Sequence, residues 1–145
     1  MCGAGTLLIE GLMMAADIAP GLNRQVQGFE NLKMHNRTVW QEIVSEVRQR
    51  RTDGLAKLEN QFFGYDSNPD QIEATISNFS RAGAGDEVLD ANVQIQSKPF
   101  QELWLRESVI KKGGLIICNP PYGERLDELP QLSPLYNELN EVTRA

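Results

Sequence analysis

Cysteine, histidine and long apolar runs are all scarce in this sequence. Its 145 residues include two cysteines, far apart at positions 2 and 118, and one histidine. Neither a disulfide framework nor a metal site is therefore expected. The sequence has no run of about 18 apolar residues that would predict a membrane span, and its first residues lack the basic segment of a secretory signal. These absences predict a protein of the reducing cytoplasm with no membrane partner.

Basic residues are also in deficit. The chain has 14 Lys and Arg against 20 Asp and Glu, which gives a formal net charge of -6. Phosphate contacts require clustered basic side chains, so this composition argues against a self-sufficient nucleic-acid binder. The chain is 41% hydrophobic and 23% charged, as is usual for one soluble globular domain.

Segments with helical periodicity alternate with apolar or alternating segments, which predicts an α/β fold with a mainly parallel sheet. The strand at 114–118 is fully apolar and is expected to be central in the sheet. Asn68 and Pro69 have the residue types of a helix N-terminus. The expected helices span 6–18, 36–51, 69–82 and 133–144, the strands 61–66, 93–97 and 114–118, a loop 21–34, and a short helix or loop 103–110.

The sequence opens on a glycine turn, whereas such turns normally follow the first strand of a doubly wound sheet. We therefore expect residues 1–145 to form a partial catalytic domain that lacks its first strand and its C-terminal strands. A helical insert is expected at about 20–60.

The opening turn consists of Cys2, Gly3, Ala4, Gly5 and Thr6. Two glycines let the backbone bend sharply, and the following helix offers unpaired N–H groups and a positive dipole end. This combination suits a carboxylate or phosphate group, although an ordinary tight turn remains an alternative. The dinucleotide fingerprint and the P-loop lysine are both missing, so neither NAD nor ATP is favoured.

Asp66 follows a short predicted strand. A carboxylate at that position can accept both ribose hydroxyls of a bound adenosine. The alternative is that Asp66 merely caps the next helix, although Asn68 already suits that role. Gly5 and Asp66 are 61 positions apart, against about 20 in the usual arrangement, and this difference indicates the insert.

Four residues, Asn119, Pro120, Pro121 and Tyr122, directly follow the apolar strand. The prolines stiffen the backbone and remove two donors. The Asn119 side-chain oxygen and the Pro120 carbonyl can then accept the two N–H bonds of an exocyclic amine, while Tyr122 stacks on the base. The base must be flipped out or single-stranded. A rigid proline turn without chemistry is the alternative.

Taken together, these motifs resemble those of class I, Rossmann-like amino methyltransferases that use S-adenosylmethionine. More narrowly, the chain is similar to the 23S ribosomal RNA guanine-N2 methyltransferases, found in some bacteria as the first catalytic half of a bifunctional K/L-type enzyme. The narrower resemblance includes Ala19-Pro20-Gly21-Leu22, Trp40-Gln41-Glu42 and Asn119-Pro120-Pro121-Tyr122-Gly123-Glu124-Arg125.

The resemblance implies that the turn from Cys2 to Thr6 holds the methionine end of the cofactor and Asp66 its ribose. Asn119 to Tyr122 would hold the guanine, with Asn119 next to the cofactor. An acid that meets the adenine amino group in the family is matched here by Pro99. The 23S rRNA would be gripped mainly by other domains. A non-catalytic fragment, or a DNA or protein-amine methyltransferase with the same loop, are the alternatives.

Overall fold

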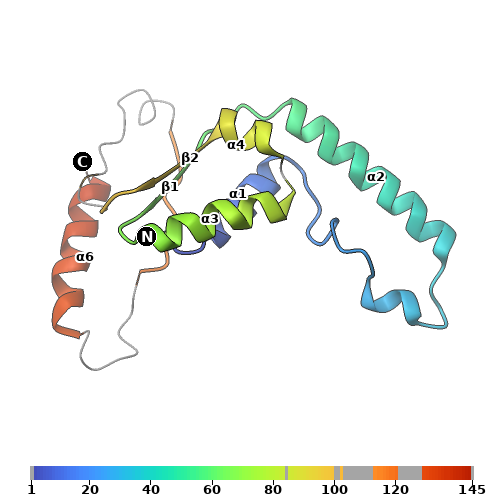
Figure 1. Cartoon of the computed structure of the whole chain (residues 1–145), viewed down its shortest axis with the longest axis horizontal. Helices are drawn as coiled ribbons and strands as arrows, with labels where there is room; N and C mark the ends of the chain where they lie inside the picture. Colours follow the sequence, from blue (N-terminus) through green and yellow to red (C-terminus); the bar gives the residue numbers. More distant parts are fainter. Residues whose placement is uncertain (1, 84, 100–101, 103–112, 121–128, 145) are drawn as a thin grey trace.

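Helices and strands alternate along the chain in the computed structural model, which describes residues 2–83, 85–99, 102, 113–120 and 129–144 (Figure 1). The elements are α1 (Thr6–Ala15), the 3₁₀ helix η1 (Gly28–Asn31), α2 (Arg37–Ala56), β1 (Phe62–Asp66), α3 (Pro69–Ala82), α4 (Asp86–Asn92), β2 (Val93–Ser97) and α6 (Leu129–Arg144).

The two strands pair in parallel, as the sequence predicts. Phe62 lies opposite Val93, and Asp66 lies opposite Ser97. Parallel neighbours need a crossover connection, which α3 and α4 provide. The α/β fold class with parallel strands is thus confirmed, and both carboxyl ends of the strands lie at one edge of the sheet.

Helix α3 begins and ends where the sequence predicts. The side chain of Asn68 accepts a hydrogen bond from the Asp70 N–H at 2.9 Å and caps the helix. Gly83 stops the helix in the left-handed conformation, with φ 77°, as glycine does at many helix ends. The buried face carries Phe79, which is 2% exposed.

Helix α1 ends at Ala15, three residues before the predicted end. The N–H of Ile18 donates to the Met13 carbonyl and the N–H of Asp17 to the Met14 carbonyl, which is the Schellman pattern. Asp17 takes the left-handed position with φ 52°. This turn directs the buried side chain of Ile18 back into the core.

The core lies where α1 and α3 pack on each other and on β1. Its members are the fully or nearly fully buried apolar residues Ile9, Leu12, Ala16, Ile18, Phe79 and Val93. Burying such side chains contributes about 1.5–3 kcal/mol each for the larger ones. The core therefore holds the helix that follows the glycine turn firmly against the strand that ends in Asp66.

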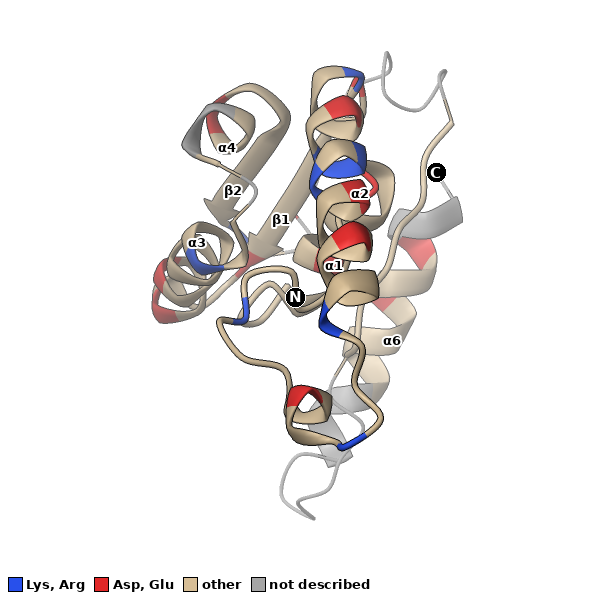
Figure 2. Cartoon of the chain, turned by 90° about the vertical axis from the view of Figure 1, so that its right-hand side faces the viewer, with Lys and Arg blue, Asp and Glu red and all other residues tan. Residues whose placement is uncertain are grey.

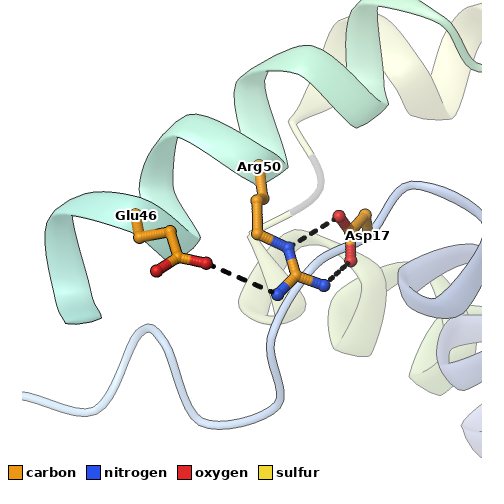
Figure 3. A network of polar contacts seen from close by, with 3 residues as sticks. All are labelled: Asp17, Glu46 and Arg50. Atoms are coloured by element: carbon orange, nitrogen blue, oxygen red, sulfur yellow. Dashed lines mark hydrogen bonds and ion pairs between the residues drawn. The ribbon is translucent and has the colours of Figure 1, made fainter.

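Helix α2 extends away from this core and has no buried residue (Figure 1). Its C-terminal end attaches to the end of α1: Arg50 donates to both carboxylate oxygens of Asp17, at 2.7 and 2.8 Å, and lies 4.0 Å from Glu46 (Figure 3). The Arg50 hydrogen bond is the main cause that lowers the pKa of Asp17 below its usual value. Helix α2 extends five residues beyond its predicted end. One of these residues, Leu55, packs against the core.

The predicted central strand at 114–118 is wrong. Residues 113–120 have no helix or strand, and the exposed fractions of Leu115, Ile116 and Ile117 are 82%, 57% and 56%. A strand requires a hydrogen-bonding neighbour, and among the described residues β1 and β2 pair only with each other. The apolar composition of 114–118 was therefore insufficient to predict that this segment pairs with another strand.

Three other segments refine the expectations. The sequence did not predict α4, and η1 lies within the predicted loop. Helix α6 begins at Leu129, four residues before its predicted start, and contains Pro134. The expectation for 103–110 lies outside the described residues. In the part of the chain that the structure describes, no helix has the length and apolarity to cross a membrane.

Candidate functional site

The glycine turn lies at the carboxyl end of β1. The Cys2 N–H donates to the Tyr65 carbonyl at 2.8 Å, and the Gly5 N–H donates to the Cys2 carbonyl at 2.9 Å. Gly3 and Gly5 have φ values of 53° and 82°, a conformation that glycine adopts at little cost. The turn therefore needs its two glycines, as the sequence predicts.

Helix α1 opens directly from this turn. Gly5 is its N-cap residue, and no side chain caps it. The N–H groups of the first helical turn lack intrahelical partners, and the helix dipole places partial positive charge there. Thr6, the first helical residue, is exposed, as is Ala4. This end of α1 can accept an anionic group.

Asp66 contacts both the glycine turn and the next helix. Its Oδ2 accepts from the Gly3 N–H at 2.9 Å, and its Oδ1 accepts from the Asn68 N–H at 3.0 Å. Partial burial raises the pKa of Asp66, but the hydrogen bonds from the N–H groups of Asn68 and Gly3 bring it below its ordinary value. Asp66 therefore stays ionised at neutral pH.

These contacts bear on both interpretations of Asp66. The alternative role, a cap for α3, belongs to the side chain of Asn68, while Asp66 accepts only from the backbone N–H of that residue. The bond to Gly3 joins the two predicted cofactor elements. An ionised carboxylate accepts about four hydrogen bonds, so these contacts are compatible with the predicted ribose-binding role.

Helix α3 supplies two side chains that the sequence analysis missed. Thr75 donates from Oγ1 to the Gly3 carbonyl at 2.8 Å, and Asn78 donates from Nδ2 to the Ala4 carbonyl at 2.8 Å. Thr75 has an exposed fraction of 0%. Its position on the apolar face of a predicted helix was a usable signal, because a buried hydroxyl needs a hydrogen-bond partner.

The predicted catalytic loop is described only in part. Asn119 is exposed and Pro120 is half-buried, whereas Pro121 and Tyr122 lie outside the described residues. Figure 1 shows segment 113–120, drawn in orange, running toward the part of the molecule where the N-terminus is marked. No hydrogen bond in the described part of the chain joins Asn119 to the glycine turn, so its catalytic role stays a prediction.

A glycine turn that opens a helix, with a carboxylate at the end of a parallel strand beside it, defines the Rossmann-like class of cofactor-binding folds. A family model described as "RMKL-like, methyltransferase domain" matches residues 1–144. The chain belongs to this family of methyltransferase domains, and the resemblance noted in the sequence is confirmed. Membership implies a methyl donor.

Two curated relatives share the name "Ribosomal RNA large subunit methyltransferase K/L". The chain is 41% identical to the one from Chromohalobacter salexigens over its full length, which covers 19% of that relative. It is 43% identical to the one from Photobacterium profundum over 96% of the chain, which covers 18% of that relative. The chain thus spans about a fifth of the length of the curated relatives it matches.

A solved structure is also similar. The crystal structure of a possible methylase from Clostridium difficile 630 superposes with a TM-score of 0.82 and is 28% identical. The match covers 99% of this chain and 35% of that one. The α/β arrangement around the glycine turn is therefore that of a methylase fold.

Proposed function

We propose that this chain is the cofactor-binding part of an S-adenosylmethionine-dependent enzyme that methylates the exocyclic N2 amine of a guanine in 23S rRNA. The observation that carries the proposal is the 2.9 Å hydrogen bond between Gly3 and Asp66. It unites a turn that suits a carboxylate with an acid that suits a ribose, within a methyltransferase family domain. The curated relatives are named as large-subunit rRNA methyltransferases.

The residues of the site fit this cofactor. The positive end of α1 and the turn from Cys2 to Thr6 would hold the methionine carboxylate, and the ionised Asp66 would accept the ribose hydroxyls. S-adenosylmethionine, when bound, supplies an electrophilic methyl group on a positively charged sulfur. The ionised Asp66 would also contribute negative charge to the site that holds this cation.

The loop at 119–122 would bind the other reactant. The Asn119 side-chain oxygen and the Pro120 carbonyl would accept the two N–H bonds of the guanine amine, which aims the nitrogen lone pair at the methyl carbon. The rigid Pro121 would keep that direction, and Tyr122 would stack on the base. The nitrogen would take the methyl group as the bond from that carbon to sulfur breaks, with S-adenosylhomocysteine as the leaving group. It would then lose its proton to solvent, so a strong general base is not required.

The negative charge of the chain indicates that other parts of the enzyme bind the RNA backbone. The net charge is -6, and in the view of Figure 2 Lys and Arg are interspersed with Asp and Glu. Binding of rRNA helices and loops would need a basic protein surface. We therefore place most phosphate contacts outside this chain, in an enzyme of the cytoplasm.

Methyl transfer from radiolabelled S-adenosylmethionine to unmodified 23S rRNA, measured with an intact enzyme that contains this chain, tests the proposal. Asn119→Ala is expected to abolish transfer and leave cofactor binding intact, whereas Asp66→Ala mainly weakens binding. Asn31→Ala changes an exposed asparagine in η1 and serves as the matched control. Full transfer by Asn119→Ala would contradict the catalytic assignment.

The alternatives predict different results. Labelling of DNA or of a protein amine in place of rRNA would support another methyltransferase with the same loop. Binding of neither S-adenosylmethionine nor its product, measured by calorimetry, would support a non-catalytic fragment.

A further inference from the structure

The orientation of the peptide groups in the glycine turn is controlled by α3. In a trans peptide, the C=O and N–H point in opposite directions, and the described residues have no cis bond. Thr75 holds the Gly3 carbonyl toward α3, so the N–H of Ala4, in the same peptide group, points away from α3. Asn78 does the same to the Ala4 carbonyl and the Gly5 N–H.

These two N–H groups differ in what they contact. The Gly5 N–H is used within the turn, by the Cys2 carbonyl. Ala4 is exposed, and its N–H is directed to the side of the turn opposite α3. A donor there, beside the first turn of α1, is placed to bind an anionic group of a ligand.

The contact between α3 and the turn is close and well supported. A Cβ at position 5 would lie 2.6 Å from Thr75 Cγ2, so the threonine side chain fills the space next to Gly5. Arg81 in turn donates to Asn78 Oδ1 at 2.9 Å, which orients the Asn78 amide toward Ala4. The turn is thus bound on one face by α3 and at Gly3 by Asp66.

We infer that Thr75 and Asn78 are positioning residues for cofactor binding, which fix the Gly3–Ala4 and Ala4–Gly5 peptide groups so that the Ala4 N–H faces the cofactor. This inference rests on the proposed function. It assigns to α3 a role in affinity for the methionine end of the cofactor without direct contact. Thr75 acts through its hydroxyl, and its methyl group only fills space.

Calorimetry with S-adenosylhomocysteine tests this role in the protein. Thr75→Val keeps the shape and removes the hydroxyl, which leaves the Gly3 carbonyl with only the weak contact from Cys2 Sγ at 3.8 Å. We expect the Kd to rise about tenfold. Thr75→Ser keeps the hydroxyl and loses a buried methyl, so its Tm should fall while its Kd stays within about twofold of wild type. A purely structural role would make Kd follow Tm in both variants.

Two further variants complete the experiment. Asn78→Ala, at a half-buried position, is expected to raise the Kd about threefold to tenfold, and it decides the question if circular dichroism shows that Thr75→Val is unfolded. Ser80→Ala, at an exposed position on the same helix, should leave Kd unchanged.

The outcomes separate the two proposals. If the wild-type protein binds and the Thr75→Val and Asn78→Ala variants bind equally tightly, the positioning role is overturned and the cofactor assignment stands. If the folded wild-type protein does not bind S-adenosylhomocysteine, the cofactor assignment fails and the positioning role fails with it.

Discussion

Replacing Gly5 with alanine should destabilise the protein more than the same change at Gly3. Gly5 has φ 82°, and placing an L-residue in the left-handed region costs about 1–2 kcal/mol. The new methyl would also lie 2.6 Å from Thr75 Cγ2, and such overpacking of a buried site costs about 1–3 kcal/mol. The expected loss for Gly5→Ala is therefore about 2–5 kcal/mol.

Gly3→Ala is the matched control. Gly3 has φ 53°, and a Cβ there would meet no atom within 4 Å, so only the backbone cost of about 1–2 kcal/mol applies. Urea unfolding followed by circular dichroism measures both losses, with unchanged m values as the condition for comparison. A double-mutant cycle of Gly5→Ala with Thr75→Ser should show favourable coupling, since the serine removes the closest atom. Equal losses for the two alanine variants, or zero coupling, would refute the steric reasoning.

Two further predictions concern Asp66 and the packing of α2. The pKa of Asp66 is lowered from its usual 3.8, so the ionised side chain stabilises the folded protein fully above that value, and this stabilisation is lost as pH falls through the lower folded pKa. The difference in Tm between wild type and Asp66→Asn should therefore be present at pH 7 and disappear in that acidic range. A difference in Tm that does not change with pH would contradict the assignment. Gly54→Ala should destabilise strongly, because its Cβ would overlap the backbone carbonyl of Ala16, whereas Gly11→Ala, inside α1 with open space around it, should stabilise by about 0.5–1 kcal/mol; urea unfolding checks both signs.

Local signals in the sequence predicted much of the fold. The capping residue Asn68, Pro69 at the first turn and Gly83 at the end define α3 from nearest-neighbour chemistry alone. The strand ending in Asp66 and the strand at 93–97 were also correctly predicted. Helix α4 was missed because it has only seven residues and a glycine N-cap, so it shows neither a full amphipathic repeat nor a side-chain cap.

The candidate site was only partly predictable. The glycine pattern and Asp66 are recognisable because left-handed backbone and a strand-end carboxylate each require particular residue types. Thr75 and Asn78 carry no such motif, and their contacts with the turn join residues more than 70 positions apart. The roles of Asn119 to Tyr122 stay predictions.

The sequence by itself determined where the backbone can bend, which helix faces are apolar and which family the chain belongs to, because these depend on residue type and short spacing. Tertiary structure alone decided that Asp66, Thr75 and Asn78 converge on one turn, and that the apolar segment 114–118 has no strand partner among the described residues. Hydrogen bonds between segments that are distant in the sequence form only when packing brings those segments together. A local sequence pattern does not show which distant segments will meet in space.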